Sequence, residues 1–229
     1  MLTISVIIPV LNEEAYLPKT LKRLKEQDPP AKEIFVVDGG SSDHTHQIAE
    51  GQATLLSSPA CISKQNNLGA RAATGDILVF LHADCGLEAG SFHELRSQMA
   101  DTEIAGGGFR HELCGSRPWL DRYLSQSGSW NAKHSQTYLG DHGIFCRRTA
   151  FLSSGGFPEV PLMYEFEFMR NLRMHGRLIQ LNKKCFASGR RFQNNGYIKT
   201  ILLMRTLRTC YRLGLPTQTL QSIYRRNGS

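Results

Sequence analysis

Short apolar runs alternate with amphipathic segments through the first hundred residues of the chain. Residues 3–8 are mostly apolar and precede Pro9, residues 33–37 are apolar after their first residue, and residues 77–81 are apolar throughout. Continuous apolar runs of this length, bounded by glycine or polar residues, are typical of strands buried on both faces of a parallel sheet. The pattern therefore predicts three central strands, with a shorter strand over residues 53–57.

Helical periodicity marks the segments between these runs. Between residues 17 and 24, leucines recur at spacings of four and three with lysine and arginine between them, which predicts an amphipathic helix. Pro18 suits the first turn of that helix, and Asn12 is its expected N-cap. A second helix is expected over residues 63–73. The alternation of strands and helices predicts an α/β fold with a mostly parallel sheet.

The pattern becomes less regular after residue 100. We expect a strand over residues 105–113, a helix over residues 119–130, and a polar turn at residues 140–143 that leads into a short strand. Trp119 and Trp130 share one face of the expected helix. They belong either to the core or to a surface that stacks on sugars.

A basic helical tail is expected at the end of the chain, over residues 191–229. Arg205, Arg208 and Arg212 share one face of its helix, and apolar side chains lie roughly opposite them. The arginines can lie on an anionic lipid surface, or they can face water while the apolar side packs on the domain. Both arrangements agree with the sequence.

The composition is that of an ordinary globular protein. The chain has 229 residues, 41% of them hydrophobic and 21% charged, which suits one large domain. No apolar run approaches the roughly 18 residues that span a bilayer, and the first residues predict a strand in place of a signal peptide. The six cysteines are scattered singly, without zinc-ligand spacing, which predicts reduced thiols in a cytoplasmic protein.

The charge balance points to an anionic partner. The chain carries 27 lysines and arginines against 20 acidic residues, a formal charge of +7. No helix-turn-helix pattern, RNA-binding aromatic motif or dense basic block accompanies this charge, so nucleic acid is not the expected partner. A phosphorylated small molecule and an acidic membrane surface remain. A cytoplasmic location, with peripheral contact at the inner face of a membrane, is expected.

Acidic side chains follow two of the predicted strands. Asp38 comes directly after one strand, and His82 and Asp84 follow another. Ligands of parallel sheets bind at the carboxyl ends of strands, so Pro9, Asp38 and Asp84 are expected along one edge. Alternation along an extended segment would direct His82 and Asp84 to one side and Ala83 to the other. Turn formation is the alternative role for both aspartates.

Four motifs in this order resemble glycosyltransferase family 2, which has the GT-A fold. They are Val6 to Glu14, Val36 to Thr45, Gly75 to Asp84, and Gly155-Gly156-Phe157 leading to Glu165. The resemblance extends over residues 3–177. It implies a Rossmann-like α/β domain with a mixed, mostly parallel sheet and a C-terminal helical extension. It also implies inverting transfer of a sugar from a UDP- or GDP-linked donor to an acceptor hydroxyl, with Mn2+ or Mg2+ as cofactor.

The motif His82-Ala83-Asp84, the stretch Gly140 to Phe145 and Pro161-Leu162-Met163 resemble a narrower bacterial subgroup. It is known as the radical-SAM/selenodomain-associated transferases and is linked to arsenosugar biosynthesis. The resemblance further implies a nucleotide-binding half at residues 1–100 and an acceptor half at residues 101–190. Neither the sugar nor the acceptor follows from the sequence.

The resemblance places the donor site in the first hundred residues. Asp38 would accept a hydrogen bond from the base, and Asp84 would bind the metal ion that bridges the two phosphates. His82 stands where relatives have an aspartate against the ribose, and a histidine satisfied at a strand end is its alternative role. Lys64 would reach the diphosphate or lie on a solvated helix face. The implied nucleotide-sugar residues are Pro9, Leu11, Glu13, Asp38, Lys64, His82 and Ala83, and the implied metal ligand is Asp84.

The resemblance places the catalytic base at Glu165. Relatives carry a Glu-Asp pair at the start of a late helix, whereas this chain has Tyr164-Glu165, so one acid of the pair is absent. Glu167 is the alternative base, and an acid that only favours the helix dipole is the structural alternative. Asp141 and His142 would line the acceptor pocket or form a plain turn.

Two other functions agree with parts of the sequence. The altered acidic pair and the basic tail suit a module that keeps the fold without the chemistry and acts at a membrane surface or in an assembly. A nucleotidyltransferase also combines a parallel sheet with a metal ion. Such enzymes usually carry a glycine-rich basic loop after the first strand, and residues 10–14 are acidic and lack glycine.

Overall fold

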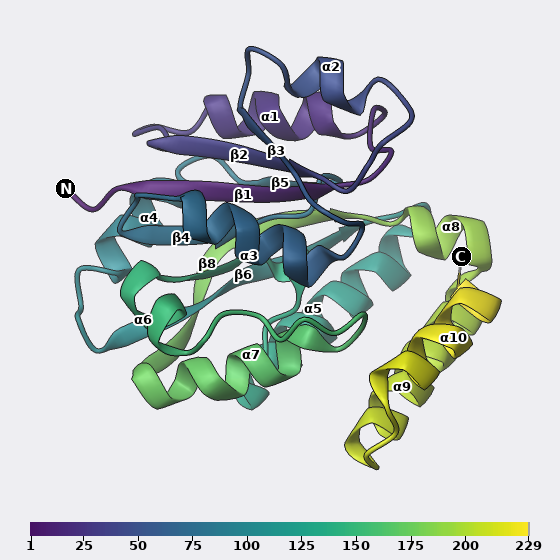
Figure 1. Ribbon diagram of the computed structural model, residues 1–229. Helices are drawn as coiled ribbons and strands as arrows, with labels where there is room; N and C mark the ends of the chain where they lie inside the picture. Colours follow the sequence, from purple (N-terminus) through teal and green to yellow (C-terminus); the bar gives the residue numbers. More distant parts are fainter. Residues whose placement is uncertain (229) are drawn as a thin grey trace.

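An eight-stranded sheet in the order β3-β2-β1-β4-β7-β6-β8-β5 forms the centre of the computed structural model, which describes residues 1–228 (Figure 1). The strands predicted in the first hundred residues are confirmed as β1 to β4, and the strand predicted at residues 105–113 is β6. The strands are β1 (Ile4–Val10), β2 (Glu33–Asp38), β3 (Thr54–Ser57), β4 (Ile77–Phe80), β5 (Cys85–Leu87), β6 (Ile104–Cys114), β7 (Ile144–Arg147) and β8 (Arg177–Ser188).

The pairing of the strands confirms the predicted mixed, mostly parallel sheet. β1 pairs in parallel with β2 and β4, β2 pairs in parallel with β3, and β6 pairs in parallel with β8. β7 runs antiparallel to both β4 and β6, and the short β5 runs antiparallel to β8. The sheet curls, so that β5 lies close to α1 although β5 and β3 are at opposite ends of the strand order.

Helices cover both faces of this sheet (Figure 1). The helices predicted at residues 63–73 and 119–130 are confirmed as α3 and α5, and the late basic helix begins at Tyr164. The helices are α1 (Leu17–Lys25), α2 (Thr45–Ala49), α3 (Ile62–Ala72), α4 (Ser91–Gln98), α5 (Pro118–Ser135), α6 (Arg148–Ser153), α7 (Tyr164–Leu172), α8 (Arg190–Asn195), α9 (Tyr197–Arg212) and α10 (Thr217–Gly228), with 3-10 turns η1 (Gly140–His142) and η2 (Arg173–His175).

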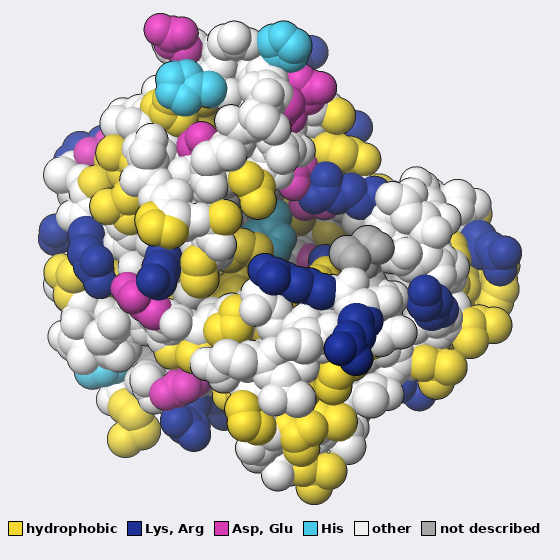
Figure 2. All heavy atoms as spheres, turned by 45° about the vertical axis from the view of Figure 1, so that its right-hand side comes forward, with side chains coloured by type: hydrophobic (Ala, Val, Ile, Leu, Met, Phe, Trp, Pro, Cys, Tyr) yellow, Lys and Arg dark blue, Asp and Glu magenta, His cyan; other side chains and the backbone are white. Residues whose placement is uncertain are grey.

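The C-terminal helices α9 and α10 form a hairpin that projects from the body of the domain (Figures 1 and 2). Leu207 and Leu220 are buried between the helices, and the ring of Tyr211 lies 5.5 Å from that of Phe166 on α7. The arginines at 205, 208 and 212 are exposed, as predicted. Ser229, the last residue of the predicted tail, lies outside the described residues.

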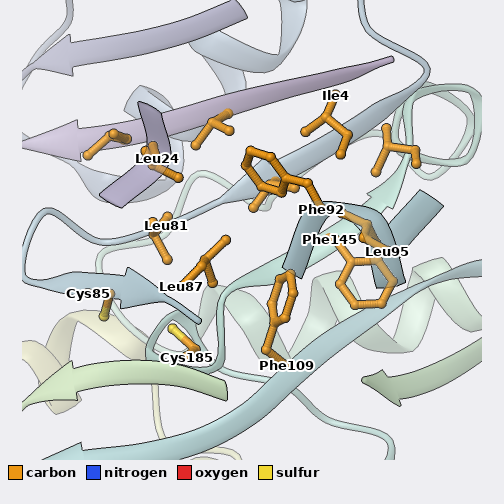
Figure 3. Packing of buried hydrophobic residues seen from close by; sticks show 14 of the residues in the cluster. Ile4, Leu24, Leu81, Cys85, Leu87, Phe92, Leu95, Phe109, Phe145 and Cys185 are labelled. Carbon is orange, nitrogen blue, oxygen red and sulfur yellow. The ribbon is translucent and has the colours of Figure 1, made fainter. Parts of the chain in front are cut away.

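Alternation along the central strands divides the core into two layers. Ile4, Val6 and Ile8 of β1 face the layer beneath α1 and α4, which Figure 3 shows together with Phe92. Ile7 faces the other layer, beneath α3 and α7, where aromatic side chains predominate. The central strands are therefore buried on both faces, which is why their sequences are almost continuously apolar.

The expected N-cap of α1 is wrong. Asn12 has a left-handed backbone conformation with φ of 55°, and its Oδ1 accepts a hydrogen bond of 2.8 Å from the amide of Ser42. The helix begins only at Leu17, after a turn in which the amide of Tyr16 donates to the carbonyl of Glu13. Asn12 therefore joins two loops at the strand ends, while the prediction for Pro18 in the first turn is confirmed.

A core position for the two tryptophans of α5 is also wrong. Trp119 and Trp130 are 73% and 61% exposed. The buried face of α5 carries small polar residues instead, because the hydroxyls of Ser125 and Ser129 accept hydrogen bonds from amides of β6. The indoles are consequently directed away from the sheet. None of the described helices is long and apolar enough to cross a membrane.

Candidate active site

The loops that follow β1 and β2 are tied together at one edge of the sheet. Val10 and Asp38 are register partners at the ends of these strands. The amide of Asn12 donates to Ser41 Oγ at 2.9 Å, and the side-chain amide of buried Gln65 donates to the carbonyl of Val10 at 2.9 Å. Side chains of both loops are therefore held at a common edge, as the parallel pairing predicts.

Asp38 is buried at this edge and partly engaged in a turn. Its Oδ1 accepts hydrogen bonds from the amide of Ser41 at 3.0 Å and from the Ser41 hydroxyl at 2.6 Å. These contacts form the turn that was the structural alternative for this residue. A carboxylate has about four acceptor positions, so the turn leaves capacity for a further donor such as a nucleobase N–H.

Two predicted donor-site residues, one near the end of β1 and one in the loop after it, differ in exposure. Pro9 is buried within β1, where it pairs in register with Val37, whereas the side chain of Leu11 is about half exposed. Lys64 lies on α3 with its ammonium 3.8 Å from the carboxylate of Glu159, and both side chains are a little under half exposed. A partly exposed ion pair of this kind favours the solvated helix face for Lys64, and its contact with a diphosphate stays a prediction.

The turn that follows β4 carries His82, Ala83 and Asp84. Ala83 faces the core, while Asp84 is turned away from it, which agrees with the expected alternation. The hydroxyl of Thr20 on α1 lies 2.7 Å from the carbonyl oxygens of both Ala83 and Cys85. One helix side chain thus fixes the backbone on both sides of Asp84, which positions this carboxylate.

Arg190 joins Glu13 and Asp84 at this edge of the sheet, and we call these three residues the donor edge. Arg190 was not predicted from the sequence. Its Nη1 and Nη2 donate to the two carboxylate oxygens of Glu13 at 2.8 and 2.6 Å, and its Nε lies 3.2 Å from Asp84 Oδ2. The guanidinium also stacks 4.7 Å over the ring of Tyr16. The hydrogen bonds to Glu13, aided by the charge of Asp84 and opposed by burial, raise the pKa of Arg190.

The donor edge fits a divalent cation that arrives with a nucleotide. No group of three acidic, histidine or cysteine side chains suited to a metal ion occurs among the described residues. Hard cations such as Mg2+ are nevertheless often held by one or two carboxylates together with substrate phosphates and water. The guanidinium beside Asp84 shows that a positive charge is accommodated at this oxygen. Asp84 therefore fits as the protein ligand of such a cation.

Asp141 and His142 lie in η1, whose first residue, Gly140, packs against the imidazole of His82. Asp141 Oδ1 lies 2.8 Å from His142 Nδ1, and Oδ2 lies 3.5 Å from Nε2 of His111 on β6. Burial raises the pKa of Asp141, but the two histidines lower it more, and the result is well below the ordinary value. His111 was also missed, because its position in the middle of a strand sequence carries no local signal of a site.

Several imidazole nitrogens near this pair have no hydrogen-bond partner among the described residues. They are Nε2 of His82, Nε2 of His142 and both ring nitrogens of His111. His111 is only 9% exposed, and burial lowers its pKa. A Cβ atom on Gly140 would collide with the imidazole of His82, so a residue without a side chain is needed there. We call His82, His111 and His142 the polar wall. Its hydrogen-bonding capacity is only partly used by the described residues.

Glu165 lies in the first turn of α7, close to this wall. Burial raises its pKa, the positive field of His82 opposes the rise, and the charge of Asp141 adds to it. The charges of His82 and Asp141 thus act on Glu165 although the three residues come from distant segments of the chain. Glu167, the alternative base, lies 3.8 Å from Arg170 with a side chain that is 42% exposed. The geometry favours Glu165 over Glu167.

The surface is hollowed between the body of the domain and the α9–α10 hairpin. Figure 2 shows histidine in this hollow and lysine or arginine side chains along its rim. Arg208 of α9 contributes to the lowered pKa of Asp141, so the charge of the hairpin acts on this predicted acceptor residue. The arrangement can hold an anionic ligand at one end and a polar hydroxyl compound at the other.

Comparison with known proteins gives a consistent family match. The sequence profile described as "Glycosyl transferase family 2" matches residues 5–159. The chain is 38% identical over 99 residues to "4,4'-diaponeurosporenoate glycosyltransferase" of Staphylococcus haemolyticus. That match covers 37% of this chain and 25% of the relative, so it spans about a quarter of the relative's length.

Two solved structures have the same fold at low sequence identity. A mannosyltransferase from Pyrobaculum calidifontis in complex with GDP-Man and Mn2+ superposes with a TM-score of 0.65 and 20% identity, covering 97% of this chain and 69% of its own. Residues 1–349 of S. aureus TarS in complex with UDP-GlcNAc give a TM-score of 0.62 and 19% identity, covering 81% and 58%. At these identities the likeness supports the fold alone.

Proposed function

Because the chain belongs to glycosyl transferase family 2, we propose that it transfers a sugar, with inversion at the anomeric carbon, from a UDP- or GDP-linked donor to an acceptor hydroxyl. The protein is a glycosyltransferase, and nucleotide sugars are the donors of both structural neighbours. The observation that carries the proposal is the meeting of Glu13, Asp84 and Arg190 at the carboxyl edge of the sheet.

The nucleotide is proposed to bind across residues 1–100. Asp38 accepts a hydrogen bond from the base, Pro9 and Leu11 flank the nucleoside, and His82 faces the ribose. The free acceptor capacity of Asp38 and the exposure of Leu11 support these roles. Ala83 is proposed to contact the donor at the turn before Asp84, and Lys64 is proposed to contact the diphosphate. Both roles rest on the family resemblance.

The departing nucleotide diphosphate requires positive charge. A Mn2+ or Mg2+ ion at Asp84 would neutralise the negative charge of the two phosphates as the nucleotide diphosphate leaves. Arg190 is the second source of charge, because its planar guanidinium suits phosphate oxygens as well as it suits the carboxylate of Glu13. We propose that Arg190 exchanges part of its contact with Glu13 and Asp84 for the diphosphate when the donor binds.

Glu165 is the proposed catalytic base. The acceptor oxygen attacks the anomeric carbon, the bond from that carbon to the diphosphate oxygen breaks, and the Glu165 carboxylate takes the acceptor's proton. A raised pKa brings a carboxylate closer to the basicity that proton abstraction near neutral pH needs, which supports the assignment.

The acceptor is proposed to bind in residues 101–190, against Asp141 and His142. The unpartnered imidazole nitrogens offer hydrogen-bonding capacity to a hydroxyl compound, which supports this location. The identity of the acceptor, and membership of the radical-SAM/selenodomain-associated subgroup, stay predictions from the sequence motifs. A cytoplasmic location is likewise part of the proposal.

A thermal-shift screen tests the donor. UDP, GDP and their common sugar conjugates are added with Mn2+, because a ligand that binds only the folded state raises the melting temperature. We expect one nucleotide family to raise Tm and its sugar conjugate to raise it further. NMR of the product or hydrolysed sugar then tests inversion, and a retained anomeric configuration would contradict it.

The second candidate is a module that keeps the fold without the chemistry. The missing acid beside Glu165 is the feature that favours it. This candidate predicts nucleotide-sugar binding without turnover on any hydroxyl compound or water. Release of nucleotide diphosphate from the bound donor would exclude it.

A further inference from the structure

Charge is distributed very unevenly along the chain. Residues 168–229 contain 13 lysines and arginines and no aspartate or glutamate, whereas residues 1–167 contain 14 basic and 20 acidic residues. The positive charge of the protein is therefore concentrated in its last quarter. Much of this last quarter is the α9–α10 hairpin, which projects from the body of the domain (Figure 1).

Helix α9 has apolar residues on two sides. Leu207 is buried against α10 and the start of α7. Ile198, Leu202 and Leu213 are 77%, 59% and 75% exposed. Their spacings of four and eleven residues place Ile198 and Leu202 on one side of the helix, roughly opposite Leu207, and Leu213 continues this side directly after the last turn. We call this second side the outer face of α9, and no described part of the chain covers it.

Arginines flank the outer face. Arg205 and Arg212 follow Leu202 at spacings of three and ten, so they lie on the same side, and both are exposed. No ion pair to either arginine occurs among the described residues. Exposed aliphatic side chains beside unpaired guanidinium groups are the features of helices that lie in the plane of a membrane interface.

We propose that the outer face of α9 docks on an anionic lipid bilayer. The aliphatic side chains would enter the boundary between headgroups and acyl chains, and the arginines would contact lipid phosphates. A second copy of the chain fits this face poorly, since it would set arginine against arginine. A nucleic acid would satisfy the arginines and leave Ile198, Leu202 and Leu213 in water.

Docking would reach the donor edge through a short connection. Helix α8 begins at Arg190, whose guanidinium holds Glu13 and Asp84, and α9 begins at Tyr197. The hydroxyl of Tyr197 donates to Asp121 at 2.7 Å, which fixes the start of α9 to α5. The docked helix α9 is thus joined directly to α8, whose first residue, Arg190, contacts Glu13 and Asp84. The docking itself does not depend on the proposed transfer reaction.

Vesicle sedimentation tests the proposal without donor or acceptor. The full chain is mixed with vesicles of phosphatidylcholine alone, or with one third phosphatidylglycerol, at low and high salt. We expect sedimentation with the anionic vesicles at low salt only. Arg205→Gln/Arg212→Gln should lower the partition coefficient about thirtyfold, since each basic side chain at an anionic surface contributes about fivefold.

Two further variants separate this surface from general charge. Ile198→Gln/Leu202→Gln keeps the charge and should also lose most of the binding. Lys19→Gln/Lys22→Gln removes two exposed lysines from α1 and should bind as the unaltered chain does. All substituted positions are exposed, and unchanged melting temperatures would show that the fold is kept.

Three results would overturn the proposal. The first is absence of sedimentation with anionic vesicles at low salt. The second is an equal loss of binding in the α1 variant, which would mean that binding depends on the total positive charge of the protein and not on the outer face of α9. The third is light scattering that shows a dimer which Ile198→Gln/Leu202→Gln dissociates, because the outer face would then be covered by a second copy.

Discussion

The two sides of the candidate site treat their polar groups in opposite ways. At the donor edge, the carboxylates of Glu13 and Asp84 share the guanidinium of Arg190 at 2.6 to 3.2 Å. On the acceptor side, Nε2 of His142 and both ring nitrogens of His111 have no hydrogen-bond partner among the described residues, and neither does Nε2 of His82 at the boundary with the donor edge. The pKa of Glu165 is raised. The donor edge is neutralised internally, whereas the acceptor side keeps ring nitrogens without hydrogen bonds beside the ion pairs of Asp141.

This difference indicates how each substrate would be received. A donor brings a diphosphate and a cation, so it can exchange with the internal ion pairs and the local charge changes little. An unpartnered buried polar group costs about 1–3 kcal/mol, and such groups in native proteins require an explanation. The acceptor side therefore carries a cost that a hydroxyl ligand would relieve.

The largest expected effect is on Glu165. Glu165→Gln should lower the rate of transfer about 10²- to 10⁴-fold, the usual contribution of a positioned base, and leave donor affinity unchanged. Because burial disfavours the ionised carboxylate, the same variant should melt at a higher temperature above neutral pH. Turnover, donor titration and thermal denaturation measure these effects. Glu167→Gln is the control, and a larger loss of rate in that variant would reverse the assignment.

The next largest effect should follow from Arg190. Arg190→Ala leaves the two carboxylates at the donor edge without a counterion, and it should lower the free energy of unfolding by about 2 kcal/mol. This figure stays below that of a fully buried pair, because the guanidinium is about a third exposed and therefore screened. Addition of Mn2+ should recover part of the loss in urea denaturation. Equal stability with and without Mn2+ would show that no cation replaces the guanidinium.

A smaller effect is expected where Gly140 contacts His82. Gly140→Ala should destabilise the fold by about 1 kcal/mol, because the imidazole must move to admit a methyl group. Gly128→Ala is the matched control, since a Cβ there meets His111 at an ordinary contact distance inside α5. The control should be neutral or slightly stabilising, as alanine favours helices. Equal melting temperatures for both variants would mean that the polar wall is loosely packed around His82.

The smallest effect concerns the pH dependence of turnover. Glu165 accepts a proton only when ionised, so the rate should fall as the pH decreases through its raised pKa, above the range of an ordinary glutamate. The charge of Asp141 contributes to that rise, so Asp141→Asn should move the acid limb to lower pH. An acid limb that moves to higher pH, or does not move, would show that the charge of Asp141 does not raise the pKa of the base.

The sequence predicts the donor half well because its signals are local. Strands β1 to β4 and the helices between them follow from apolar runs and leucine spacing, and parallel pairing then brings Asp38 and Asp84 to one edge. Arg190 could not be predicted this way, since it is 177 residues from Glu13 and lies in a basic segment. The same holds for His111, which meets Asp141 through the antiparallel pairing of β6 with β7. It holds also for Trp119 and Trp130, whose helix is oriented by serine contacts.

The central claim is that Asp84 and a divalent cation hold a nucleotide diphosphate at the donor edge. Calorimetric titration of UDP and GDP into the full chain, with and without Mn2+, tests it most directly, with Asp84→Asn as the variant. We predict that one nucleotide binds with Mn2+, and that its affinity falls about tenfold or more when either Mn2+ or the carboxylate is removed. Absence of binding with Mn2+, or equal affinity in Asp84→Asn, would contradict the claim.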